Sequence, residues 1–291
     1  MFSGGLLMTP MISRKIRERS SRNLTGSFAF EVAMELPLEN GWPDRLWIVR
    51  HGESSGNVAR DRAHATGSFD IEIDGRDVDV TLSDRGEQQS IALGQWFAAM
   101  PVDARPDVVL TSPYLRARKT AQAIQRVSGF ADTFKNNDVI DERLREKEFG
   151  ILDRLTQLGI ENRHPELAEA RRSLGKFYFR PPGGESWCDV ILRLRSMMDT
   201  ISIHYSGKRV LIVAHQVVVL CMRYLLEKLD EQEILAIDAE GDIANCGVTE
   251  YAFVNDGRGG ALKLKRYNFV APLVVQGAPV TSEPERNAAR R

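Results

Sequence analysis

The chain has few cysteines, no long apolar run and almost no net charge, and each shortage excludes a class of protein. The 3 cysteines show no paired spacing, so neither a disulfide framework nor a cysteine-rich zinc site is expected. No apolar run approaches the length of a membrane span. The formal net charge of -1 argues against nucleic acid as the main partner. We therefore expect a cytoplasmic protein with neither a nucleic acid nor a membrane partner.

Both ends of the chain differ from its centre. Residues 1–44 are predicted to be an extension that is partly disordered or packs as an appended helix. The start, Met1–Pro10, is followed rather than preceded by the basic stretch Arg14–Arg22, which does not fit a secretory signal, while a transit segment stays open. Residues 278–291 are predicted to form a mobile polar tail. The main domain is then 45–277.

Strand-like and helix-like segments alternate through this domain, which predicts an α/β fold with a mostly parallel sheet. Hydrophobic residues make up 43% of the chain, enough for a large core. The last two strands, joined by a glycine-rich turn, predict an antiparallel hairpin at one edge. The expected strands are 46–49, 108–111, 209–214, 248–254 and 261–267, and the expected helices are 83–100, 116–127, 187–205 and 216–229.

The first strand ends in Arg50 and His51, which places a cation and an imidazole at its carboxyl end. Ligands bind at this end of the strands in open α/β sheets. Gly52 allows a tight turn, and Ser54 and Asn57 are candidate caps for a helix whose free N–H groups face an anion. A charged pair followed by an ordinary turn is the simpler alternative.

Two other strands repeat this arrangement. The strand 108–111 is followed by Ser112 and then Arg116, and the strand 209–214 by His215. If the three strands are parallel, these side chains and His51 line one crevice. Guanidinium groups bind phosphate oxygens in pairs and stay charged. The predicted pocket therefore combines fixed cations, from Arg50 and Arg116, with an imidazole nucleophile.

A metal site is a weaker interpretation of the two histidines. Zinc requires three or four convergent ligands, and neighbouring arginines repel a cation. We expect neither a metal nor another cofactor.

Several motifs occur in a fixed order between about Leu46 and Tyr251. They are Arg50–Glu53 with Asn57, Leu82–Ser83 with Gly86 and Gln89, Ser112–Ala121, Leu144 with Glu146, Phe149 and Gly150, Pro182–Ser186, and Ala214–His215. Together they resemble the histidine phosphatase, or phosphoglycerate mutase-like, superfamily and favour its phosphatase branch. The resemblance implies a three-layer α/β/α sandwich. It also implies that His51 is phosphorylated, that Arg50, Arg116 and His215 bind the phosphoryl group, and that Glu146 transfers the proton.

Glu146 has two neighbours, Glu142 and Glu148, with which its role could be confused. Loop carboxylates exposed to solvent are the simpler interpretation of both. Asn57 and Gln216 are further expected contacts for the substrate or its phosphate, since the amide of Gln216 can reach the substrate.

Departures from the family pattern favour hydrolysis over mutase chemistry. His215-Gln216 resembles the fructose-2,6-bisphosphatase branch, whereas mutases usually carry His-Gly-Asn-Ser there. We therefore expect a metal-independent phosphatase acting on a small phosphorylated substrate. A mutase-type phosphotransferase and a non-catalytic phosphate-binding protein are the alternatives. The segment 151–182, rich in arginine and aromatics, is a candidate specificity lid or a surface helix. No residue indicates the oligomeric state.

Overall fold

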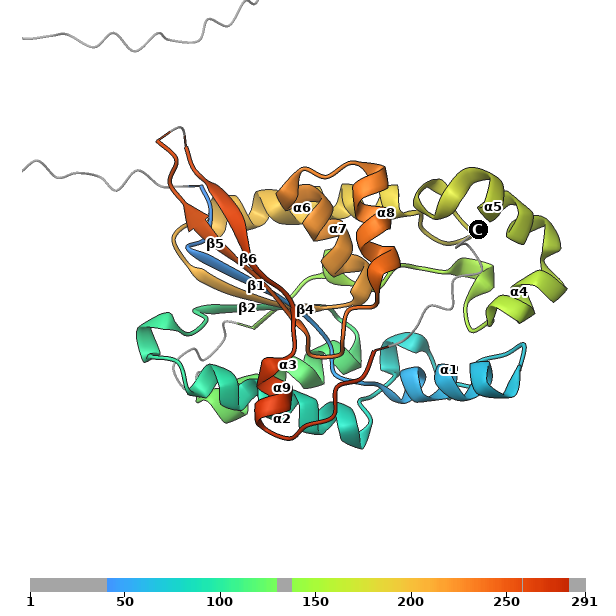
Figure 1. Cartoon of the computed structure of the whole chain (residues 1–291), viewed down its shortest axis with the longest axis horizontal. Helices are drawn as coiled ribbons and strands as arrows, with labels where there is room; N and C mark the ends of the chain where they lie inside the picture. The colour runs from blue at the N-terminus through green and yellow to red at the C-terminus, as the bar shows by residue number, and fades with distance from the viewer. Residues whose placement is uncertain (1–40, 130–137, 258, 283–291) are drawn as a thin grey trace, which may run out of the picture. The chain divides into compact units, whose positions relative to one another are not determined.

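The structure is a computed structural model and describes residues 41–129, 138–257 and 259–282. Most of the predicted N-terminal extension, residues 1–40, lies outside the described residues, as does 283–291 of the predicted tail. Within the described part, a β-sheet lies between two layers of helices (Figure 1). No helix in these ranges is long and apolar enough to cross a membrane.

The central sheet has six strands in the order β3-β2-β4-β1-β5-β6. The first four run parallel, whereas β5 pairs antiparallel with β1, and β6 antiparallel with β5. The predicted mostly parallel sheet with an antiparallel edge is confirmed. The strands are β1 (Arg45–Arg50), β2 (Val108–Thr111), β3 (Asp138–Ile140), β4 (Arg209–Ala214), β5 (Val248–Val254) and β6 (Ala261–Phe269).

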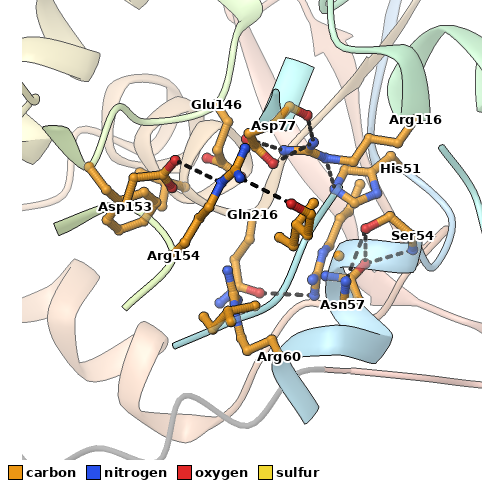
Figure 2. Close-up of a pocket in the computed structure, with 16 residues that line it drawn as sticks. His51, Ser54, Asn57, Arg60, Asp77, Arg116, Glu146, Asp153, Arg154 and Gln216 are labelled. Carbon is orange, nitrogen blue, oxygen red and sulfur yellow. Dashed lines mark hydrogen bonds and ion pairs between the residues drawn. The ribbon is translucent and has the colours of Figure 1, made fainter. Parts of the chain in front are cut away.

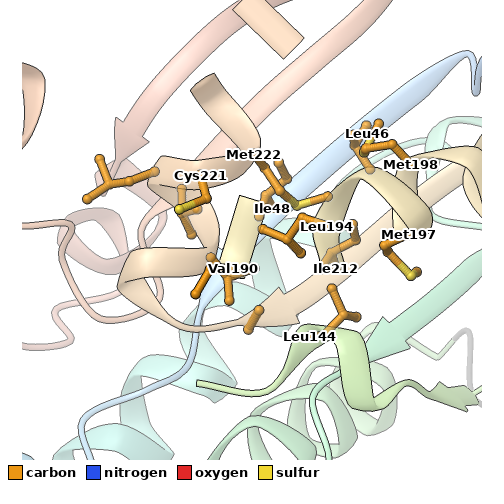
Figure 3. Packing of buried hydrophobic residues seen from close by; sticks show 14 of the residues in the cluster. Leu46, Ile48, Leu144, Val190, Leu194, Met197, Met198, Ile212, Cys221 and Met222 are labelled. Atoms are coloured by element: carbon orange, nitrogen blue, oxygen red, sulfur yellow. The ribbon is translucent and has the colours of Figure 1, made fainter. Parts of the chain in front are cut away.

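The three central strands β1, β2 and β4 are buried along nearly their whole length because helices cover both faces of the sheet. Successive side chains of a strand point to opposite faces. In β1, Leu46 and Ile48 join the core under α6, α7 and α8 (Figure 3), while Trp47 and Val49 join the core under α2, α3 and α9. These helices are α2 (Asp84–Ala98), α3 (Leu115–Ser128), α6 (Trp187–His204), α7 (Gln216–Glu227), α8 (Glu231–Glu240) and α9 (Ala271–Val275).

Three further helices lie in the segments that connect the layers. They are α1 (Ser55–Thr66), α4 (Gln157–Arg163) and α5 (Pro165–Tyr178). The last two fall within the candidate lid, and α5 is kinked at Gly175, whose φ is +80°. The four helices expected from periodicity are all present with small shifts at their ends. Neither β3 nor α8 was predicted from the sequence. The strand β3 has only 3 residues, too few to show a periodic pattern.

Residues 278–282 pack against the domain. The backbone N–H of Asn245 donates to the Thr281 carbonyl at 2.8 Å. The Gln89 amide donates to the Pro279 carbonyl at 2.9 Å and to the Thr281 hydroxyl at 2.7 Å. The start of the predicted tail thus contacts the domain through Pro279 and Thr281.

Candidate active site

The carboxyl ends of β1, β2 and β4 meet at one edge of the sheet. Since β1 and β4 are parallel and in register, His51 and His215 follow paired residues, and the His51 N–H donates to the Ala214 carbonyl at 2.9 Å. The two imidazole centroids lie 5.1 Å apart. The N–H of Ser112 donates to the Val213 carbonyl at 3.1 Å. Three segments distant in sequence thus converge as expected.

The turn after His51 is shaped by close backbone packing and by a helix cap. A Cβ on Gly52 would lie 2.5 Å from the Gly86 carbonyl oxygen, so no larger residue fits. The Ser54 hydroxyl accepts from the Asn57 N–H at 3.2 Å, and the Asn57 side-chain oxygen accepts from the Ser54 N–H at 2.8 Å. This reciprocal pair caps α1. Asn57 also lines the pocket.

The His51 imidazole is held as a neutral base. Its Nδ1 lies 2.7 Å from the Gly52 carbonyl oxygen, and because a carbonyl only accepts, Nδ1 carries the hydrogen. Nε2 is therefore unprotonated and accepts from Arg116 Nε at 3.3 Å. Burial, followed by the charges of Arg116 and Arg50, holds the pKa of His51 well below its ordinary value. The lone pair of Nε2 can attack an electrophile once the hydrogen bond from Arg116 Nε is released.

Arg116 lies in the first turn of α3 and is bound by an acidic residue that sequence reasoning missed. Its guanidinium donates to both carboxylate oxygens of Asp77 at 3.1 Å and to the Asp77 carbonyl at 2.8 Å. It also lies over the Tyr114 ring, 4.7 Å from the centroid. Asp77 belongs to a short turn between α1 and α2, and no pattern in the sequence connects it to α3.

Arg50 is held by a different set of partners from Arg116. Its Nη1 donates to the Gln216 side-chain oxygen at 3.0 Å and to the Ile243 carbonyl at 2.5 Å. The Gln216 amide nitrogen donates in turn to Asp242 at 2.9 Å. Both ends of the Gln216 carboxamide, predicted to contact the substrate, are therefore engaged here.

His215, which is fully buried, and Glu146, which is partly buried, form a second pair. His215 Nε2 lies 2.7 Å from the Ser112 hydroxyl, and Nδ1 lies 3.5 Å from Glu146 Oε2. Burial, followed by the charges of Arg116 and His51, lowers the pKa of His215 well below its ordinary value. Burial raises the pKa of Glu146, although the Lys147 N–H donates to its carboxylate at 2.8 Å. A carboxyl group in this state is suited to carry a proton.

The structure separates Glu146 from its two neighbours. Glu146 lines the pocket, with 17% of its side chain exposed. Glu148 instead accepts from the Tyr114 hydroxyl at 3.3 Å and has 47% of its side chain exposed. Glu142 is exposed. Of the three carboxylates, Glu146 is thus the one with access to a bound substrate.

The pocket encloses about 820 Å³, open solvent included, and Figure 2 shows its charged lining. Arg154, with φ of +60°, donates to the Ile73 carbonyl at 3.0 Å and so joins two loops of the rim. Within the described ranges, no three His, Cys, Asp or Glu side chains gather in a metal-binding arrangement. Asp153 and Arg154 belong to the candidate lid 151–182, and the lining residues that the sequence did not single out are Gly56, Arg60, Ile71, Ile73, Asp77 and Val217.

The imidazole, guanidinium and carboxyl groups together determine which reaction the site can support. A neutral imidazole shares a pocket with two guanidinium groups, with a second imidazole and a protonatable carboxyl nearby. Such a site can accept a phosphoryl group and neutralise the charge on its oxygens.

The profile of the histidine phosphatase superfamily (branch 1) matches residues 46–268, and the chain belongs to this superfamily. The resemblance inferred from the motifs is confirmed, as is the implied fold. Among solved structures, Bacillus stearothermophilus YhfR is similar with a TM-score of 0.60 and 23% identity, covering 79% of this chain and 98% of that one. The mycobacterial glucosyl-3-phosphoglycerate phosphatase Rv2419c, in complex with inorganic phosphate, gives a TM-score of 0.59 at 23% identity, covering 79% and 99%.

Curated relatives include both phosphatases and mutases by name. The bifunctional protein Rv2228c of Mycobacterium tuberculosis is 32% identical over 191 residues, which is 63% of this chain but only 46% of that protein. A probable phosphoglycerate mutase GpmB of Erwinia tasmaniensis is 31% identical, covering 59% of this chain and 69% of its own. Fructose-2,6-bisphosphatase of Saccharomyces cerevisiae is 28% identical, covering 66% and 36%.

Proposed function

We propose that the chain is a metal-independent phosphatase that hydrolyses phosphomonoesters through a phosphohistidine at His51. The observation that carries the proposal is the state of the His51 ring. Nδ1 is bound to the Gly52 carbonyl, and the unprotonated Nε2 lies 3.3 Å from Arg116 Nε. A nucleophile and a phosphate-binding cation are thus adjacent in one buried site.

The reaction proceeds in two displacements. His51 Nε2 attacks phosphorus and forms an N–P bond while the P–O bond to the alcohol breaks, and Glu146 donates its proton to the departing oxygen. Water then attacks phosphorus, gives a proton to the Glu146 carboxylate, and the N–P bond breaks to release inorganic phosphate. One carboxyl group serves as acid and then as base, which balances the protons over the cycle.

Fixed cations replace a metal ion in this scheme. Arg50 and Arg116 line the same pocket as His51 and bind the phosphoryl oxygens. His215, held by Ser112, donates a further hydrogen bond once it is protonated beside the bound anion. We therefore expect activity to survive exhaustive chelation, and loss on chelation with recovery by a divalent ion would indicate a metallophosphatase instead.

The decisive experiment follows the covalent intermediate. A brief acid-quenched reaction with 32P-labelled substrate should leave label on the wild-type protein at His51, and His51→Ala should retain its fold but lose at least about 10³-fold in activity. His64→Ala, a histidine outside the pocket, is the matched control and should behave as wild type. Substantial activity in His51→Ala rejects the proposal.

Mutase chemistry is distinguished by the fate of the phosphoenzyme. The departures after His215 and Gly150 from the mutase pattern favour transfer to water. Free phosphate should therefore exceed interconversion of 3- and 2-phosphoglycerate by a wide margin. Rapid interconversion with little free phosphate would assign the chain to the mutases. A phosphate-binding protein without turnover would release no phosphate from any ester in a substrate panel.

A further inference from the structure

One motif plays no direct part in the pocket. The turn at Pro182-Gly183-Gly184-Glu185 packs backbone to backbone against the segment that follows Glu146. The Glu185 N–H donates to the Glu148 carbonyl at 2.9 Å, and the Ile151 N–H donates to the Pro182 carbonyl at 3.0 Å. A Cβ on Gly184 would lie 2.6 Å from the Glu148 carbonyl oxygen. The missing side chain of Gly184 therefore allows this close contact.

The Glu185 side chain extends the contact with charge. Its buried carboxylate accepts from the Glu148 N–H at 3.1 Å and from Arg145 Nη2 at 2.7 Å. It also accepts from Arg193 Nε at 2.9 Å and Arg193 Nη2 at 3.1 Å. Burial raises the pKa of Glu185, but the hydrogen bonds and charge of Arg193, the Glu148 N–H and the charge of Arg145 together outweigh it and hold this pKa below the ordinary value. Glu185 is therefore an anion between two arginines.

Arg193, on α6, carries the contact back to the residues before and at Glu146. Its Nη1 donates to the Arg143 carbonyl, and its Nη2 donates to the Glu146 carbonyl at 3.3 Å. Glu185 and Arg193 together thus bind backbone groups on both sides of Glu146. The side chain of Arg193 is only 10% exposed, so this fork is sheltered from water.

Glu146 needs such support because it lies in no regular secondary structure. Residues 146–149 belong to neither a helix nor a strand. Local backbone hydrogen bonds therefore do not fix the carboxyl group, and proton transfer is sensitive to errors of about 1 Å in position. Fixed backbone anchors on either side of a donor reduce that error.

We propose that Glu185 and Arg193 are positioning residues for proton transfer, which hold the segment 143–148 so that Glu146 faces the leaving oxygen. This rests on the proposed function, in which Glu146 is the proton donor. Neither residue lines the pocket, so they act through Glu146 and not on the substrate.

The test compares two substrates that differ in their need for an acid. An alkyl phosphate has a poor leaving group and requires protonation, whereas the phenolate of p-nitrophenyl phosphate departs with little help. Glu185→Gln should lower kcat/KM for the alkyl ester about tenfold and that for p-nitrophenyl phosphate less than twofold. Arg193→Lys, which keeps the charge but lacks the fork, should give the same selective loss and serves if Glu185→Gln does not fold.

Coupling to Glu146 is measured with a double mutant. Glu146→Gln/Glu185→Gln should be no slower on the alkyl ester than Glu146→Gln alone, because a misplaced donor matters only when a donor exists. Asp189→Asn is the matched control. This carboxylate also lies at the start of α6 but contacts Ser186 and Arg180 instead. It should affect both esters equally.

The outcomes separate this proposal from the one on which it rests. Equal losses on both esters in Glu185→Gln and Arg193→Lys, or additive losses in the double mutant, overturn the positioning role while leaving Glu146 as donor. Absence of leaving-group selectivity in Glu146→Gln itself removes the donor assignment, and the positioning role falls with it. Neither result bears on the proposed phosphorylation of His51, which the labelling experiment tests separately.

Discussion

The two sides of the pocket are built differently. The sheet edge supplies His51 to the lining, and His215 lies buried beside it, with 5.1 Å between the ring centroids, at the end of the adjacent parallel strand. The opposite rim comes from loops that supply Asp77, Asp153 and Arg154, with side chains 34% to 48% exposed. The strand ends fix groups to the rigid core, and the loops place adjustable charges around them. We expect the reaction to depend on the first set and its tuning on the second.

The largest effect on kcat/KM should come from the side of the pocket that is fixed to the core. Arg116→Gln removes a charge that binds the transferring phosphoryl group, so kcat/KM should fall about 10²- to 10³-fold for every ester. Arg118→Gln, two residues further along α3 and outside the pocket, is the control and should stay within about twofold of wild type. Steady-state kinetics on purified variants measure both, and similar values for the two variants would show that the phosphoryl group binds elsewhere.

The difference between the strand ends and the loops also explains which site residues could be predicted from the sequence. Strand ends are readable because apolar runs locate the strands, and parallel pairing then brings Arg50, His51 and His215 to one edge. That part of the site, and the layered fold, were predicted. Position 146 came from the resemblance to the family, and not from any periodicity.

The loop residues could not be found this way. Asp77 reaches Arg116 across 39 positions in sequence, and Arg154 reaches the carbonyl of Ile73 across 81. Loop geometry depends on tertiary packing and leaves no periodic signal. Gln216 was noticed, but its engagement by Arg50 and Asp242 requires coordinates.

The pH dependence of kcat/KM tests the protonation states of His51 and Glu146. His51 must be neutral, and its lowered pKa keeps it so down to a pH well below about 6.5. Glu146 must be protonated, and its raised pKa extends that state above the ordinary range. The kcat/KM for an alkyl phosphate should peak between these two pKa values and fall about tenfold per pH unit above the Glu146 pKa. In Glu146→Gln the alkaline fall should vanish, and its persistence would point to another acid.

A smaller effect is expected where one anchor of Arg50 is removed. Gln216→Leu deletes the oxygen that accepts from Arg50, while the Ile243 carbonyl still binds the guanidinium. Loss of one such hydrogen bond lowers kcat/KM about three- to tenfold. Adding Gln216→Leu to Arg50→Gln should cost little more, since the anchor then holds nothing. Full additivity in this cycle would show that Gln216 contacts the substrate directly.

On the loop side, an effect of similar size and opposite sign is expected. The Asp77 carboxylate accepts from both Nη1 and Nη2 of Arg116, so an incoming phosphate competes with it for these two donors. Asp77→Asn removes the charge and should tighten inhibition by inorganic phosphate about three- to tenfold. Asp77 also contributes to the raised pKa of Glu146, so its removal should start the alkaline fall at lower pH. Asp79→Asn, whose carboxylate pairs with exposed Arg76, should do neither. Weaker phosphate inhibition in Asp77→Asn would mean that the carboxylate orients Arg116 for the anion and does not compete with it.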